Sequence, residues 1–79
     1  MTADAYPHDA VHCHLDALLE ARGMTLTELA RRVDITIANL SILKNDRAKA
    51  VRFSTLAAIC HELQCQPGDL FTVGPRPAR

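Results

Sequence analysis

The stretch that decides the fold is TLTELARRVDITIANLSILKND, residues 25–46. It contains two short helical patterns, and each is preceded by a threonine able to cap a helix, Thr25 before the first and Thr36 before the second. Thr25 and Glu28 also have the spacing of a capping box. Only about three or four residues join the patterns, and so short a joint makes the second helix cross the first, the geometry of a helix-turn-helix.

The second pattern predicts a helix over residues 37–44 with apolar residues on two sides. Leu40 and Leu43 lie three residues apart, as a core-facing pair does. At about 100° per residue, four residues fall on the opposite side of the helix: Ala38, Ser41, Ile42 and Asn45. Ile42 is therefore held away from the core just before a loop that contains lysine and arginine. Single exposed apolar residues are common, so the meaning of Ile42 depends on the rest of the chain.

Length and composition limit the class of protein. The chain has 79 residues, of which 48% are hydrophobic and only 4% are aromatic. This length suits one small domain, and the composition predicts a helical, aliphatic core. The sequence has neither a run of roughly 18 apolar residues that could span a membrane nor a secretory signal pattern at its start. We therefore expect a cytoplasmic protein without a membrane partner.

Charge is unevenly distributed along the chain, although the formal net charge is zero. Residues 1–20 contain four acidic residues and neither lysine nor arginine. Residues 21–52 contain seven basic residues against three acidic ones, a balance of +4. One face of a neutral protein can thus be basic, and a polyanion responds to that local potential rather than to the total charge.

Weaker patterns flank the two central helices. Residues 10–14 alternate apolar and polar side chains as a strand does, and the β-leaning residues 71–73 could pair with them. Three further helices are expected: one from Leu15 to a stop at Gly23, one over residues 55–64 capped by Ser54, and one turn that begins at Pro67. The predicted organisation is a flexible arm over residues 1–9, a single domain over residues 10–74 and a flexible tail over residues 75–79.

Cysteine and histidine leave a metal site as an alternative. Three cysteines cannot all pair within one chain, and we interpret Cys13, Cys60 and Cys65 as buried free thiols in a reducing compartment. A histidine lies on either side of Cys13 and another follows Cys60, so a metal-responsive regulator is a rival hypothesis. The spacings are neither C-x-x-C nor H-x-x-x-H, and a closed zinc site needs about four ligands. We predict no metal and no other cofactor.

The longer run MTLTELARRVDITIANLSILKNDRAKAVRFSTLAAICHELQCQPGDLF, residues 24–71, resembles the Cro/repressor-type (Xre) helix-turn-helix transcriptional regulators. Its RFSTL and CQPGDL segments make it similar to the small stand-alone members. The resemblance implies a mainly α, five-helix, phage-repressor-like domain with a short N-/C-terminal β-strand pair. It also implies a sequence-specific DNA-binding regulator, with repression as the expected effect, whose partners are double-stranded DNA and a second copy of the chain.

The resemblance places the helix over residues 37–44 in the major groove. It implies base contacts by four residues: Ile37, Ala38, Ser41 and Ile42. An apolar side chain that faces the groove can contact thymine methyl groups, which would explain the exposed position of Ile42. It implies phosphate contacts by seven residues: Thr25, Thr27, Asn39, Asn45, Arg47, Lys49 and Arg52. The two threonines among them precede or begin a helix, where backbone amides and the helix dipole attract phosphate.

The chain departs from the family pattern at two positions. Asp34 and Asp46 stand where the family commonly has glycine. Aspartate tolerates left-handed backbone better than most residues, so the fold should form, but each adds negative charge near the expected phosphate path. A protein-interaction module or antitoxin-like co-regulator of the same fold is therefore an alternative. An enzyme is not expected, because the sequence shows no catalytic triad order, glycine loop or paired carboxylates.

A homodimer is expected because one recognition helix reads only about 3–5 base pairs. Two surfaces are candidates for the dimer contact: the strand pair formed by residues 10–14 and 71–74, and the apolar C-terminal turn around Leu70 and Phe71. Pairing between protomers would cover a strand edge that otherwise leaves backbone groups unpaired.

Overall fold

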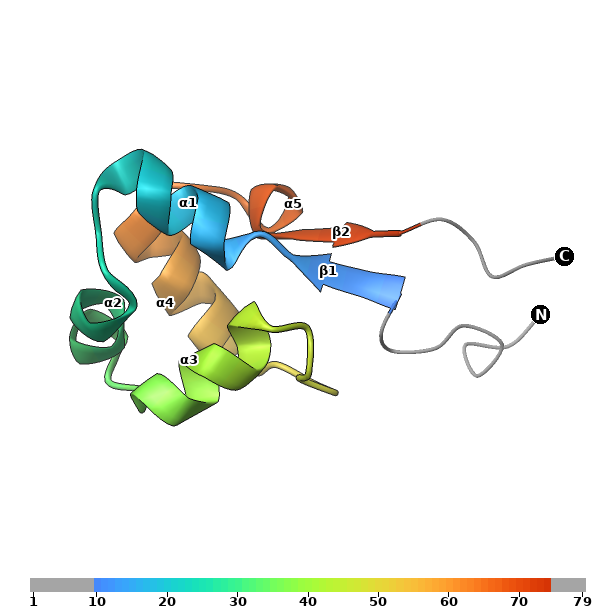
Figure 1. The fold of residues 1–79 in the computed structure, drawn as a ribbon, viewed down its shortest axis with the longest axis horizontal. Coiled ribbons are helices and arrows are strands. Elements are labelled where there is room, and N and C mark those ends of the chain that lie inside the picture. Colours follow the sequence, from blue (N-terminus) through green and yellow to red (C-terminus); the bar gives the residue numbers. More distant parts are fainter. Residues whose placement is uncertain (1–9, 75–79) are drawn as a thin grey trace, which may run out of the picture.

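The computed structural model describes residues 10–74 of the chain, and these residues fold into five helices and one antiparallel pair of strands. The order is β1 (Val11–Cys13), α1 (Leu15–Arg22), α2 (Leu26–Val33), α3 (Ile37–Lys44), α4 (Phe53–Leu63), α5 (Pro67–Leu70) and β2 (Phe71–Val73). Figure 1 shows α4 in the middle of the helices, with the strand ribbon projecting from one end. The predicted fold class is confirmed, whereas the predicted arm and tail, residues 1–9 and 75–79, lie outside the described residues.

Both threonine caps form as predicted. The Thr25 hydroxyl accepts the Glu28 N–H at 3.1 Å, and the Thr36 hydroxyl accepts the Asn39 N–H at the same distance. The reciprocal half of the capping box at Thr25 is replaced, because the Glu28 carboxylate instead accepts hydrogen bonds from Arg31 and Arg32. Charge-assisted bonds to guanidinium groups are stronger than a bond to a neutral backbone amide.

The predicted start of the fourth helix was wrong. The helix begins at Phe53 rather than at residue 55, and Ser54 lies within its first turn instead of capping it. Arg52 is the N-cap, with extended backbone, and its carbonyl accepts the Leu56 N–H at 2.9 Å. Among residues 10–74 no side-chain cap holds this start, and Leu56 packs against the core one turn before Ile59.

Both aspartates that replace the family's glycine adopt left-handed backbone, with φ of 56° at Asp34 and 62° at Asp46. Asp34 ends α2 and opens the short turn before α3, and Asp46 lies just after the end of α3. The conformation that favours glycine is therefore retained at both positions without glycine, at a modest conformational cost for each aspartate.

The core is entirely aliphatic among the described residues. Its buried members come from all five helices: Leu15, Leu19, Leu29, Ala30, Leu40, Leu43, Ile59, Leu63 and Leu70. Leu70 is fully buried, so it is not exposed for the dimer contact that one hypothesis placed around Leu70 and Phe71, whereas Phe71 is half-buried. The three cysteines are half-buried at the edge of this core rather than fully buried, which corrects the expectation for the thiols.

The β1–β2 ribbon pairs Val11 with Val73 and Cys13 with Phe71 across the strands. Backbone bonds from His14 to Leu70 at 2.7 Å and from Gly74 to Ala10 at 2.6 Å close its two ends. Cys13 and Phe71 pack against the core, whereas Val11 and Val73 remain exposed. Within the described residues, none of the helices is long and apolar enough to cross a membrane.

Candidate nucleic-acid interface

Helix α3 has one buried side and one exposed side. Leu40 and Leu43 are 1% and 6% exposed, and they join α3 to the core. Ile37 and Ile42 are 47% and 45% exposed on the same helix. The predicted two-sided pattern of α3 is confirmed. Because α3 starts at a side-chain cap and is held by two buried leucines, its exposed side has a defined orientation.

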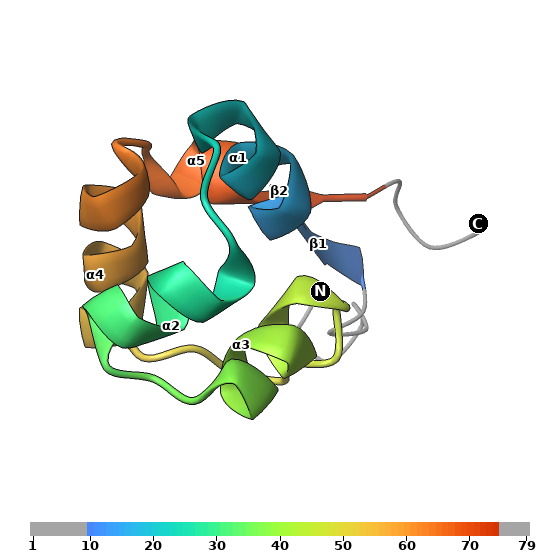
Figure 2. The ribbon, with the colours of Figure 1, turned by 60° about the vertical axis from the view of Figure 1, so that its left-hand side comes forward.

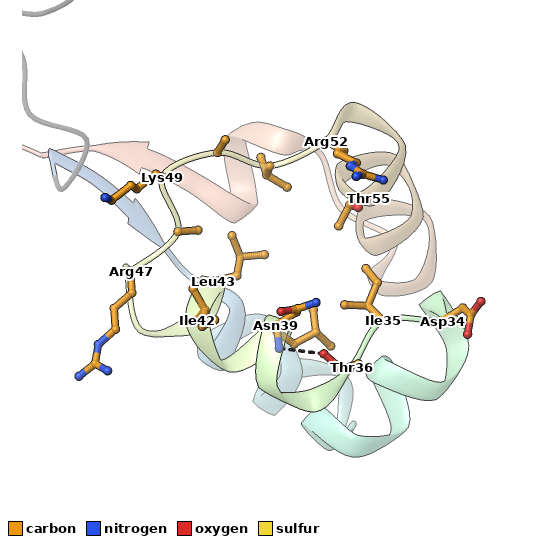
Figure 3. Close-up of a pocket in the computed structure, with 14 residues that line it drawn as sticks. Asp34, Ile35, Thr36, Asn39, Ile42, Leu43, Arg47, Lys49, Arg52 and Thr55 are labelled. Atoms are coloured by element: carbon orange, nitrogen blue, oxygen red, sulfur yellow. Dashed lines mark hydrogen bonds between the residues drawn. The ribbon is translucent and has the colours of Figure 1, made fainter.

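An open groove of about 580 Å³ lies between α3, the segment that follows it and the start of α4. In Figure 2 this segment leaves α3 and continues, in yellow, to α4. Five of the residues predicted to contact DNA line the groove together: Asn39, Ile42, Arg47, Lys49 and Arg52. Figure 3 shows their side chains around it, with the basic groups reaching outward from the connecting segment.

The other predicted residues lie outside this groove. Three of them are on α3 (Ile37, Ala38 and Ser41), two are at the start of α2 (Thr25 and Thr27), and Asn45 follows α3. All are exposed except Ser41, which is half-buried. The Thr25 hydroxyl is occupied by the cap of α2, and the exposed Thr27 lies in the first turn of that helix. The predicted contacts thus divide between the groove, the exposed side of α3 and the start of α2.

The basic residues of the segment 21–52 fall into two groups in the structure. Four of them are engaged by the protein itself: Arg22 with backbone carbonyls, Arg31 with Glu28, Arg32 with Glu28 and Glu62, and Lys44 with Asp16. The remaining three, Arg47, Lys49 and Arg52, form no ion pair or side-chain hydrogen bond with any residue of 10–74. All three are exposed and line the groove. Within residues 10–74, the basic side chains that have no partner in the protein therefore lie together beside α3.

The positive charges of Arg31 and Arg32 are balanced by acidic side chains, chiefly Glu28. Hydrogen bonds from Arg32 and then Arg31 lower the pKa of the Glu28 carboxyl, and the bonds to Glu28 and Glu62 raise the pKa of Arg32. Arg31 and Arg32 are exposed, but both have acidic partners, so they add little net positive potential to this face.

Residues 14–75 match the sequence profile of the Cro/C1-type HTH DNA-binding domain. The chain belongs to this family. It is also similar to the uncharacterized HTH-type transcriptional regulator YozG of Bacillus subtilis (strain 168), with 59% identity over 61 residues that cover 77% of this chain and 73% of YozG. Among solved structures it is similar to the clp gene regulator ClgR from Corynebacterium glutamicum, with a TM-score of 0.63 and 33% identity. That match covers 70% of this chain and 57% of the ClgR chain, so this chain spans little more than half of ClgR.

Family membership confirms the resemblance inferred from the sequence, and α2 and α3 are the two helices that the short joint was predicted to connect. Three residues of this region were not predicted as site residues from the sequence. Thr36 and Thr55 line the groove, and Phe53, next to Arg52, is 86% exposed. The predicted helix over residues 55–64 left Phe53 in the preceding loop and made Thr55 its first residue. In the structure both residues belong to the first turn of α4.

The histidines and cysteines do not assemble into one site within residues 10–74, where no group of three potential metal ligands occurs. His12 contacts Asp46, and His14 lies 2.6 Å from the Thr72 hydroxyl. Burial raises the pKa of the Cys13 thiol, and burial together with the neighbouring Cys60 raises that of Cys65 to about 11. Thiols with raised pKa values are poor metal ligands and poor nucleophiles at neutral pH.

Proposed function

We propose that this chain is a sequence-specific transcriptional regulator that places α3 in the major groove of duplex DNA and acts as a repressor. The observation that carries the proposal is the position of three unpartnered basic side chains, Arg47, Lys49 and Arg52, beside the exposed side of α3. Membership of a DNA-binding domain family supports the choice of partner. The proposed role is non-enzymatic and cytoplasmic, because the partner is DNA.

In this proposal the two sides of the site have different tasks. Ile37, Ala38, Ser41 and Ile42 face base edges, where the isoleucines contact thymine methyl groups and the serine exchanges hydrogen bonds. Phosphate contacts come from the groove residues Asn39, Arg47, Lys49 and Arg52, from Asn45 and from the threonines at the start of α2. No arginine or glutamine lies at the base-facing positions, so sequence-dependent DNA shape contributes to specificity as well.

A homodimer is part of the proposal. Operators of this type are read by two helices about 34 Å apart, one turn of the duplex. The exposure of Val11 and Val73, 41% and 72%, supports the strand ribbon as the contact, because the two residues form a cross-strand apolar pair that remains open to solvent within residues 10–74. A ribbon of two three-residue strands is marginal in water by itself, and a second copy would bury its apolar face.

The test is selection of bound duplexes from a random-sequence pool with the purified chain. We expect an enriched motif with two related half-sites spaced by about one helical turn. The variant Ile42→Ala should shift base preference within each half-site, while Arg31→Ala, at an exposed arginine outside the groove, should not. Failure to enrich any motif, together with salt-independent weak binding, would contradict the proposal and favour a protein-interaction module of the same fold.

A further inference from the structure

Both carboxylate oxygens of Asp46 are bound by strand β1. Asp46 Oδ1 accepts the backbone N–H of Cys13 at 2.8 Å, and Oδ2 lies 3.1 Å from Nδ1 of His12. The residues are more than thirty positions apart in sequence, so this contact joins the segment after α3 to the strand ribbon. It also provides a partner for a strand N–H that does not pair with β2.

Asp46 lies between the end of α3 and the basic segment, residues 47–52, that follows it. Its own N–H donates to the carbonyl of Leu43 at 3.2 Å, and the N–H of the next residue, Arg47, donates to the carbonyl of Ile42 at 2.9 Å. A side chain that is held on both oxygens therefore determines the direction in which the chain leaves α3. Arg47 and Lys49 follow within three residues, and both line the groove.

The turn alone does not explain an aspartate at this position. The backbone is left-handed, with φ of 62°, and glycine adopts that conformation at lower cost. A carboxylate near a phosphate path also opposes DNA binding by repulsion. Asp34 provides the comparison, because it has the same backbone conformation yet its carboxylate forms no hydrogen bond or ion pair with residues 10–74. Of these two aspartates, Asp46 alone joins two elements of residues 10–74 through its side chain.

We propose that Asp46 is a positioning residue for DNA binding, whose carboxylate clasps the basic segment to β1 and thereby holds Arg47 and Lys49 at the groove. This inference rests on the proposed function, since it concerns how the same surface binds phosphate. The clasp, defined as Asp46 with Cys13 and His12, makes DNA affinity depend on a strand that is not among the residues proposed to contact DNA.

The test compares two variants of equal charge, Asp46→Asn and Asp46→Gly, in the full chain with duplex DNA. Both remove the negative charge, and glycine suits the backbone better, so repulsion and strain alone predict that Asp46→Gly binds at least as tightly as Asp46→Asn. Asparagine keeps an oxygen that can accept the Cys13 N–H, whereas glycine keeps none. We therefore expect Asp46→Gly to bind on the order of fivefold more weakly than Asp46→Asn, the size of a lost hydrogen bond.

The matched pair Asp34→Asn and Asp34→Gly is the control for the left-handed backbone; because Asp34 itself lines the groove, these two are compared only by the exchange readout below, which should be the same in both variants. A second readout needs no DNA. Amide hydrogen exchange at Cys13 and Arg47 should be faster in Asp46→Gly than in Asp46→Asn. Equal affinity and equal exchange in the two Asp46 variants would overturn the inference. If the wild-type chain does not bind duplex DNA, the proposed function fails, and the exchange comparison still decides whether the clasp orders the segment.

Discussion

Arg22 closes the C-terminal end of a helix to which it does not belong. Its Nε donates to the backbone carbonyl of Leu63 at 2.7 Å, and its terminal nitrogen donates to that of Gln64 at 3.2 Å. The last carbonyls of a helix lack partners within the helix, and the negative end of its dipole attracts a cation. The end of α1 is thereby joined to the end of α4, on the opposite side of the core from the groove.

We predict that Arg22→Ala lowers the free energy of unfolding by about 1–2 kcal/mol, because it leaves two helix-terminal carbonyls to water. Arg22→Lys should restore only part of this, since an ammonium group cannot donate through a planar fork to both carbonyls. Urea unfolding followed by circular dichroism measures the change. The control Arg31→Ala, at a side chain 73% exposed in a surface ion pair, should change stability far less, and an equal loss in both variants would contradict the assignment.

The cap of α3 should matter for stability as well as for DNA binding. Thr36→Ala removes the acceptor of the Asn39 N–H and should cost about 1 kcal/mol in unfolding free energy. Thr36→Ser should be close to wild type because serine caps equally well. Thr27, an exposed threonine that is not a cap, is the matched control, and Thr27→Ala should be nearly neutral in the same urea titration.

The three unpartnered basic residues should account for most of the salt dependence of DNA binding. Arg47→Ala, Lys49→Ala and Arg52→Ala should each weaken binding to all duplexes alike and reduce the slope of log K against log salt by about 0.9. Fluorescence anisotropy at several salt concentrations measures this slope. Arg31→Ala should leave it nearly unchanged, because Arg31 is already paired with Glu28. A triple variant with the wild-type slope would remove these residues from the interface.

Asp46 should make stability depend on pH in the acid range. The Cys13 N–H and then His12 hold the pKa of the Asp46 carboxyl below its usual value of 3.8 in the folded chain. A carboxyl with a lowered pKa stabilises the fold at pH values above its unfolded pKa, and this contribution is lost as the pH falls through the folded pKa. The melting-temperature advantage of wild type over Asp46→Asn should therefore be steady near pH 5 and shrink as the pH falls below about 4 and through the lowered folded pKa. An advantage that stays constant through this range would show that the carboxylate is not the stabilising form.

The strand ribbon should control the oligomeric state. Val73 is 72% exposed, so Val73→Lys can be introduced without disturbing the core. We expect the wild-type chain to sediment as a dimer at tens of micromolar and Val73→Lys as a monomer, because a buried charge at the contact is costly. Ile37→Lys, at an exposed residue of α3 far from the ribbon in sequence, should remain dimeric. Deletion of residues 1–14 should likewise yield a monomer with weaker operator binding, and a monomeric wild type would refute the dimer.

The local structure of this protein was predictable because it depends on neighbours within one helical turn. Thr25 and Thr36 cap helices through contacts three residues away, and Leu40 and Leu43 face the core through the helical period. The alternation of residues 10–14 was enough to predict a strand, and the excess of basic residues after Gly23 was enough to suggest an anionic partner. These signals are short-range, so they can be found in the sequence itself.

The tertiary structure decided which of the candidate basic residues have partners within the protein and which do not, among residues 10–74. Ion pairs with acidic residues distinguish Arg31 and Arg32 from the three basic residues of the groove, a difference that the residue types alone do not show. The burial of Leu70 and the contacts of Arg22 and Asp46 each depend on residues far along the chain. Such contacts leave no periodic pattern, because only the packing of helices and strands around the common core brings their partners together.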